Sequence, residues 1–177
     1  MSTAHGRRPA MALYNAEMKE SRSPHPVSQG ATRALLDEYE RAAGEFLRVV
    51  EGFHDEAFAA ERPSEDPSCV SVREVARHVC HAARHYAADL GRALDAEYAM
   101  PDWPDIDMLR ESTDVRACLG AALGHTAEVA RRLESMAPQE VTATRFEMSW
   151  GQLYDPEILL EHAIVHLLRH RRQLERW

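Results

Sequence analysis

Four long stretches of this 177-residue chain repeat apolar residues at three- and four-residue intervals, the pattern of an amphipathic helix. The sequence predicts helices over 31–51, 72–97, 114–136 and from 156 toward the C-terminus. No segment reads as paired strands. Four amphipathic helices joined by connections of moderate length predict an all-α fold, a four-helix bundle.

Local signals mark where these helices begin. Ser71-Val-Arg-Glu74 is a capping-box pattern, in which the Ser71 side chain can accept a hydrogen bond from the Glu74 amide. Asp155-Pro156 combines an N-cap aspartate with proline at the first helical position. Thr113 or Asp114 is expected to cap the third helix.

Prolines and aromatic residues mark the connections. Residues 53–69, with a short helical turn, and residues 98–111 are predicted as loops, and Pro138 is expected to end the third helix. The stretch 139–154 is aromatic and rich in turn residues. Residues 1–29 are polar and broken by prolines, which predicts a flexible N-terminal arm before a single domain over 30–177.

Three histidines stand one helical turn apart in the last predicted helix, at His162, His166 and His170. Residues four apart lie on one helix face with about 5–6 Å between their Cβ atoms, a workable separation for two imidazoles on one metal ion. His166 and His170 fall within the apolar face, whereas His162 lies at its rim. The alternative is core histidines bonded to carbonyls, carboxylates or water, because an unsatisfied buried nitrogen costs about 1–3 kcal/mol.

A catalytic metal site usually draws a third protein ligand from another element and leaves one position open. The second predicted helix offers His78, His81 and His85. His78 lies nearest the apolar face and is the preferred candidate, while His81 is expected to face solvent. A boundary histidine with a solvated edge is the alternative for each, and His125 in the third helix is expected to be structural.

Composition excludes several function classes. The net charge of −8 argues against non-specific binding to nucleic acid or to an anionic membrane. Cys69, Cys80 and Cys118 form no Cys-x-x-Cys motif and leave one thiol unpaired in any disulfide scheme, which favours a reducing cytoplasm. No apolar run reaches the roughly 18 residues of a membrane span, and the N-terminus lacks the apolar segment of a signal peptide. We therefore expect a cytoplasmic protein. Lys19 is the only lysine and all other basic residues of the Lys/Arg type are arginines, a bias typical of a GC-rich bacterial genome.

Common catalytic motifs are missing from the sequence. There is no His-Glu-x-x-His, so a zinc peptidase is unsupported. Ferritin-like di-iron bundles need two Glu-x-x-His units, and the one such unit, Glu51-Gly-Phe-His54, is interrupted by a helix-breaking glycine. No Gly-x-Ser-x-Gly and no phosphate-binding glycine loop occurs.

Two motifs nevertheless resemble those of a known family. Ser71-Val-Arg-Glu-Val-Ala-Arg-His78 resembles the opening of the second helix of the DinB/YfiT-like superfamily. His166-Leu-Leu-Arg-His170-Arg-Arg-Gln173 resembles its closing helix, which typically ends His-x-x-x-His-Arg-Gly-Gln. With the Phe146–Trp150 segment and the helix order, the resemblance covers residues 31–177. Arg172 replaces the usual glycine.

The resemblance implies that His78, His166 and His170 bind one divalent metal ion, which agrees with their positions on the helical wheel. His162 permits another register, in which His162 and His166 are the pair from the last helix. Three neutral imidazoles with an open position suit Zn²⁺, Ni²⁺ or Fe²⁺, and the ligand type does not choose among them.

The family includes thiol-dependent transferases and isomerases that use bacillithiol or mycothiol, and many members without a known activity. The resemblance therefore implies a small-molecule substrate and a low-molecular-weight cellular thiol that supplies the nucleophile. The loop around Trp103 and the Phe146–Tyr154 segment are predicted to clamp this thiol. The alternative is that these aromatic residues only cap the core. Two alternatives stay open: a metal-dependent hydrolase, and a non-catalytic stress or ligand-binding bundle, which could be a homodimer.

Overall fold

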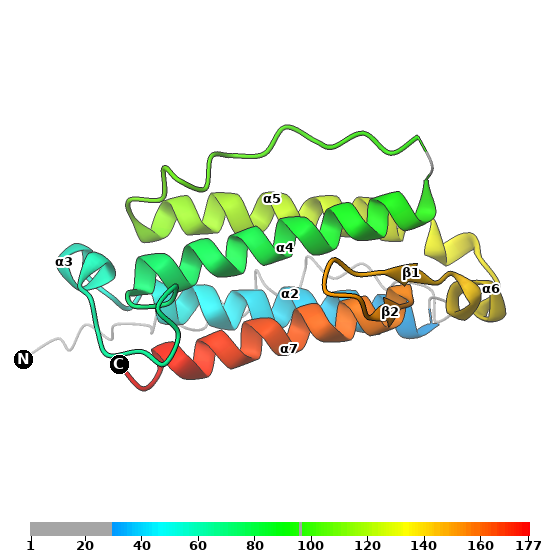
Figure 1. Cartoon of the computed structure of the whole chain (residues 1–177). Coiled ribbons are helices and arrows are strands. Elements are labelled where there is room, and N and C mark those ends of the chain that lie inside the picture. The colour runs from blue at the N-terminus through cyan, green and yellow to red at the C-terminus, as the bar shows by residue number, and fades with distance from the viewer. Residues whose placement is uncertain (1–29, 96) are drawn as a thin grey trace, which may run out of the picture.

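Four long helices build the body of the molecule (Figure 1). The computed structural model describes residues 30–95 and 97–177, so the predicted arm over residues 1–29 lies outside the described residues. The helices are α2 (Gly30–Val50), α4 (Val72–Leu94), α5 (Ser112–Ala130) and α7 (Pro156–Leu174). The predicted all-α four-helix bundle is confirmed.

The helices form two pairs stacked on each other. Helix α2 packs against α7 and α4 packs against α5, while α4 also contacts α7 and α2 contacts α5. Apolar side chains from all four helices meet between the pairs, and the largest include Tyr39, Phe46, Leu90, Leu119, Leu159 and Leu167. None of the described helices has the length and apolar character needed to cross a bilayer.

Short elements fill the connections, and some differ from the prediction. They are α3 (Asp55–Ala59), the 3₁₀ turn η1 (Leu133–Ser135), α6 (Pro138–Ala143), β1 (Phe146–Glu147) and β2 (Leu153–Tyr154). The third helix ends at Ala130 instead of near residue 136, and Pro138 begins a helix where it was expected only to end one. The second helix ends at Leu94, three residues early.

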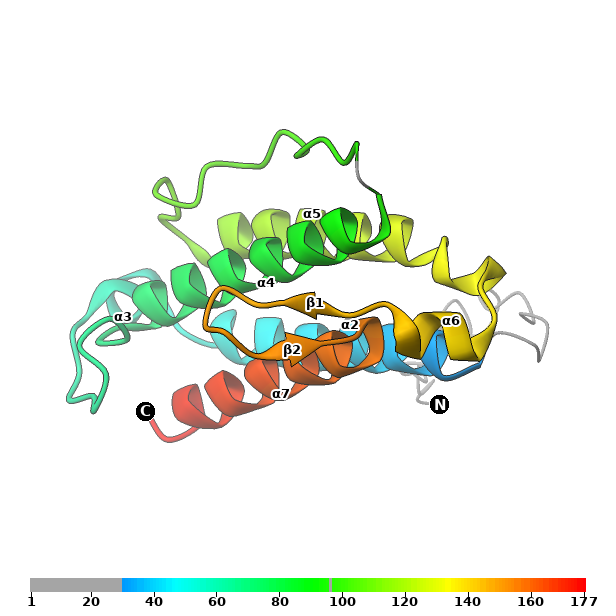
Figure 2. The ribbon, with the colours of Figure 1, turned by 45° about the vertical axis from the view of Figure 1, so that its right-hand side comes forward.

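The prediction of no paired strands was wrong for the segment before α7. Strands β1 and β2 pair antiparallel, with Phe146 opposite Tyr154. Gly151, at φ +84°, makes the turn between them, and the Met148 amide donates to the Gln152 carbonyl at 2.8 Å. Two-residue strands are too short to show the alternation by which a strand is recognised. The hairpin lies beside the N-terminal half of α7 (Figure 2).

The predicted caps of the second and fourth helices are present. The Glu74 amide donates to Ser71 Oγ at 3.2 Å, and the Ile158 amide donates to an Asp155 carboxylate oxygen at 2.9 Å. The third helix is capped by Glu111 instead of Thr113 or Asp114. These caps satisfy amides that a helix start leaves without intrahelical partners, and they fix where α4 and α7 begin.

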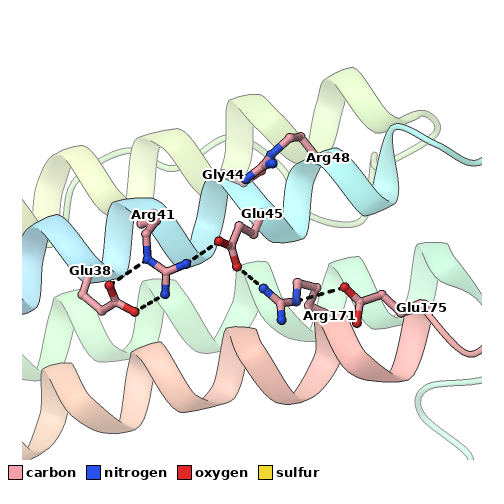
Figure 3. A network of polar contacts seen from close by, with 7 residues as sticks. All are labelled: Glu38, Arg41, Gly44, Glu45, Arg48, Arg171 and Glu175. Atoms are coloured by element: carbon pink, nitrogen blue, oxygen red, sulfur yellow. Dashed lines mark hydrogen bonds and ion pairs between the residues drawn. The ribbon is translucent and has the colours of Figure 1, made fainter.

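A polar network joins α2 to α7 along one side of the bundle (Figure 3). Glu45 on α2 accepts from Arg41 on its own helix and from Arg171 on α7. Arg171 also pairs with Glu175 at 3.2 Å. Because Arg171 directly follows His170, this network helps to fix the rotation of α7 that points His170 into the bundle.

Two glycines test this packing as a matched pair. A Cβ atom on Gly91 would lie 2.2 Å from the Tyr98 ring, which is held by a 2.7 Å hydrogen bond between its hydroxyl and His125 Nε2. We expect Gly91→Ala to lower the free energy of unfolding by about 1–3 kcal/mol, as overpacking does. Gly120→Ala, with open space around its Cβ on α5, should raise it by about 0.5–1 kcal/mol. Urea unfolding measures both, and equal stability of the two variants would contradict the packing described.

Candidate metal centre

The contact between α4 and α7 brings His78 opposite His166 and His170. On α4, the neighbouring Val75 and Val79 are buried in the core, so His78 lies at the edge of the apolar face. On α7, the apolar face turns His170 inward, where 4% of its surface is exposed. His78 and His166 are half-buried. Two helix faces thus meet with three imidazoles between them.

The three rings converge on one point. Each offers a nitrogen, and these nitrogens all lie within 4.8 Å of one another. His78 Nε2 and His166 Nε2 are 3.0 Å apart, and the ring centroids of His166 and His170 are 4.6 Å apart. Nitrogens bound to one tetrahedral ion at about 2.0–2.1 Å lie about 3.3 Å apart. The three donors could therefore hold one metal ion after small side-chain adjustments.

Burial keeps these imidazoles neutral. Burial is the largest cause of a fall in the pKa of His166 to about 3, to which the neighbouring His170, His78 and His162 rings and the Arg169 charge also contribute. Burial also lowers the pKa of His78 and of His170. A neutral imidazole is the form that binds a metal. The site therefore needs no proton removed from these rings before an ion binds near neutral pH.

A hydrogen bond from His170 to Gln173 fixes which nitrogen of His170 is free. His170 Nδ1 lies 2.9 Å from Gln173 Oε1 and, because a side-chain amide oxygen only accepts, Nδ1 carries the proton. Nε2 of the neutral ring then has a free lone pair. Gln173 Nε2 in turn donates to the Cys69 carbonyl at 3.4 Å, which holds the amide in this orientation. A partner of this kind orients a metal-binding histidine.

His162 lies outside this group of three. The Tyr154 hydroxyl is 2.8 Å from His162 Nδ1, and the Trp150 ring stacks on the imidazole at 5.5 Å between centroids. The His162 and His166 rings are parallel but 6.5 Å apart. The hairpin thus holds His162 beside the three rings, and the two α7 histidines with nitrogens within 4.8 Å of His78 are His166 and His170.

The other histidines of residues 30–95 and 97–177 have separate environments. His81 is exposed, as expected, and contacts His85, which is also exposed. His125 is hydrogen-bonded to Tyr98 and packs against the Trp103 ring, which fits the structural role predicted for it. His54 caps α3 by accepting from the Ala57 amide.

Two cavities border the histidine site. One of about 460 Å³ is lined by His170, by Trp177 and by the connection that carries Asp66. The other, of about 370 Å³, is lined by His162, His166 and Tyr154. Trp103, predicted to share in a clamp, lines neither and borders a cavity with His81 and His85 instead. Of the predicted clamp, the structure brings Tyr154 to the site.

Sequence reasoning missed several residues of these cavities. Asp66 stands in an irregular connection without periodicity, so no pattern assigned it a place. Gln173 was part of the recognised motif, but its contact with His170 was not anticipated. Its spacing of three from His170 on one helix could have indicated it, because residues three apart are neighbours on a helix surface.

The sequence model of the DinB family matches residues 27–177. The chain belongs to the DinB family. No curated protein matches it at significant similarity. Membership fits the bundle and the histidine triad, and together they indicate a DinB-like protein with a site able to bind a metal ion. They leave the reaction and the identity of the metal to the proposal below.

The role of Gln173 can be tested by Gln173→Leu. This change removes the acceptor that fixes His170, and loss of such a partner typically lowers metal affinity by about 10–100-fold. Competition with a zinc chelator measures the affinity, and Gln139→Leu, at an exposed position on α6, is the matched control. Unchanged affinity in Gln173→Leu would show that the contact does not support metal binding.

Proposed function

We propose that this DinB-family protein is a divalent-metal-dependent enzyme that transfers a low-molecular-weight thiol to a small substrate or uses it to isomerise one. In this proposal His78, His166 and His170 hold one ion, either Zn²⁺, Ni²⁺ or Fe²⁺. The convergence of three neutral imidazoles between α4 and α7 carries the proposal. Cavities on both sides leave room for a cosubstrate and a substrate.

The bound ion would supply a nucleophile near neutral pH by lowering the pKa of a coordinated thiol from about 8.5, or that of a water. The residues of the chain would position this chemistry. Gln173 holds His170 with Nε2 free. If the Tyr154 hydroxyl donates to His162 Nδ1, the proton of the neutral His162 ring lies on Nε2. His162 could then donate a hydrogen bond from Nε2 in the cavity that it shares with His166.

The cysteines of the chain support a nucleophile that comes from a cosubstrate. Cys69, Cys80 and Cys118 are all buried. Burial raises the pKa of the Cys80 thiol to about 12 and also raises those of Cys69 and Cys118. A thiol is nucleophilic as its thiolate, so none of the three suits catalysis at neutral pH.

Metal-dependent hydrolysis is the second candidate, with water in the position of the thiol. The cavity beside His170 favours hydrolysis, because Glu65 and Asp66 line it with polar groups to which water can hydrogen-bond. A non-catalytic binding bundle would instead hold any ion in a closed shell of four protein ligands, as structural sites do.

Cobalt substitution tests the proposal. We expect protein loaded with Co²⁺ and titrated with cellular thiols to develop a sulfur-to-cobalt charge-transfer band, because the open position accepts a thiolate. His166→Ala should lose the band. His81→Ala is the matched control, since it removes the exposed His81–His85 pair that could bind Co²⁺ on the surface.

Flat spectra with every thiol, on fully loaded protein, would contradict thiol chemistry and favour the hydrolase or the binding bundle. An exchangeable water on the cobalt would then support the hydrolase. A band that survives in His166→Ala but disappears in His81→Ala would place the cobalt on the surface of α4 and overturn the proposed site.

A further inference from the structure

Arg169 lies beside the histidine site and has no ion-pair partner among the described residues. It lies on α7 between His166 and His170, and it lines both of the cavities that border the site. The side chain is exposed. Among residues 30–95 and 97–177, no carboxylate forms an ion pair with it and no group accepts a hydrogen bond from it. A guanidinium without a partner among these residues thus lines both cavities.

The charge of Arg169 acts on the site itself. It contributes to the lowered pKa of His78, His166 and His170, which shows that the guanidinium lies close enough to all three rings to oppose a further positive charge. Three neutral imidazoles would leave the charge of a bound divalent ion uncompensated. The nearby Asp66 carboxylate is already hydrogen-bonded to the Ser68 amide and hydroxyl, at 2.9 and 2.6 Å. These hydrogen bonds leave the Asp66 charge in place, and it opposes the effect of Arg169 at His78 and His170. Asp66 does not line the cavity that holds His166, and there Arg169, together with a divalent ion on neutral imidazoles, would favour an anionic ligand.

Apolar side chains continue the same side of α7. Ile158 and Val165 line the cavity that holds His166, and they are 37% and 62% exposed. Val165 lies one helical turn from Arg169, about 6 Å along the axis. Glu161 lines the same cavity about 12 Å from Arg169 along the axis. Ile158 lies one turn beyond Glu161, so the apolar surface between the two charges is that of Val165. A ligand placed there meets a cation on one side and a carboxylate on the other.

We propose that the substrate of this site is a small organic acid whose carboxylate binds Arg169 and whose apolar body lies against Val165. This inference rests on the proposed function, which places the reacting atoms at the histidine triad. The planar guanidinium fork matches a carboxylate through two parallel hydrogen bonds. Glu161 repels the acid group from the opposite end, so the acid binds in one orientation with its apolar part near His166.

Binding of matched probes tests the inference without any measurement of turnover. Calorimetry would compare 3-phenylpropionate with its neutral amide, on zinc-loaded and on metal-free protein. We expect the acid to bind the zinc-loaded protein about tenfold more tightly than the amide does, because a charge-assisted hydrogen bond is stronger than a neutral one. Arg169→Gln should remove this preference. Arg172→Gln, an exposed arginine of the same helix that lines neither cavity, should retain it.

Equal binding of the acid and the amide, or a preference that survives in Arg169→Gln, would overturn the inference. A third probe, phenyl phosphate, is also an anion. If it bound more than tenfold tighter than the acid, the substrate would be a phosphate ester and the proposed carboxylic acid would be wrong. The metal-free protein separates the two proposals. In one outcome the chain takes up no zinc and still prefers the acid in a way that depends on Arg169. That result would contradict the proposed metal-dependent enzyme and support the proposed binding of a carboxylate at Arg169.

Discussion

The packing of α4 against α7 is the constraint on which the candidate site depends. It places His78 within hydrogen-bond distance of His166 and turns His170 into the same space. Burial in this contact keeps the three rings neutral, because a charged imidazole loses more hydration than its neighbours replace. The same contact therefore sets both the positions of the nitrogen atoms and the protonation state in which they can bind a metal.

Three kinds of interaction in the surrounding structure support this contact. The Ser71 and Asp155 caps fix where the two helices begin, and the Arg171–Glu45 pair ties α7 to α2. Gln173 links His170 to the backbone at Cys69. The Arg171–Glu45 pair is partly buried, and its value here is to select one rotation of α7. A change in that rotation would move His166 and His170 away from His78.

The bundle and the site histidines could be predicted because both follow from helical periodicity. The apolar spacing gave four helices in the right order, and the wheel positions of His78, His166 and His170 pointed to the space where the structure brings them together. The β-hairpin and the position of Trp103 could not be predicted in the same way. Two-residue strands have no readable period, and the path of the 98–111 connection depends on contacts such as Tyr98 with His125. Arg169 was visible as a residue of the motif, but its lack of a partner among the described residues is a property of the folded surface alone.

Metal analysis of protein purified without a histidine tag tests the central claim most directly. The account predicts about one equivalent of a divalent ion per chain, lost in His78→Ala, His166→Ala and His170→Ala and retained in His162→Ala. Less than a few tenths of an equivalent, unrestored by added metal, would contradict it and identify the three as core histidines. Loss of metal in His162→Ala together with its retention in His170→Ala would show that His162 and His166 are the pair from α7.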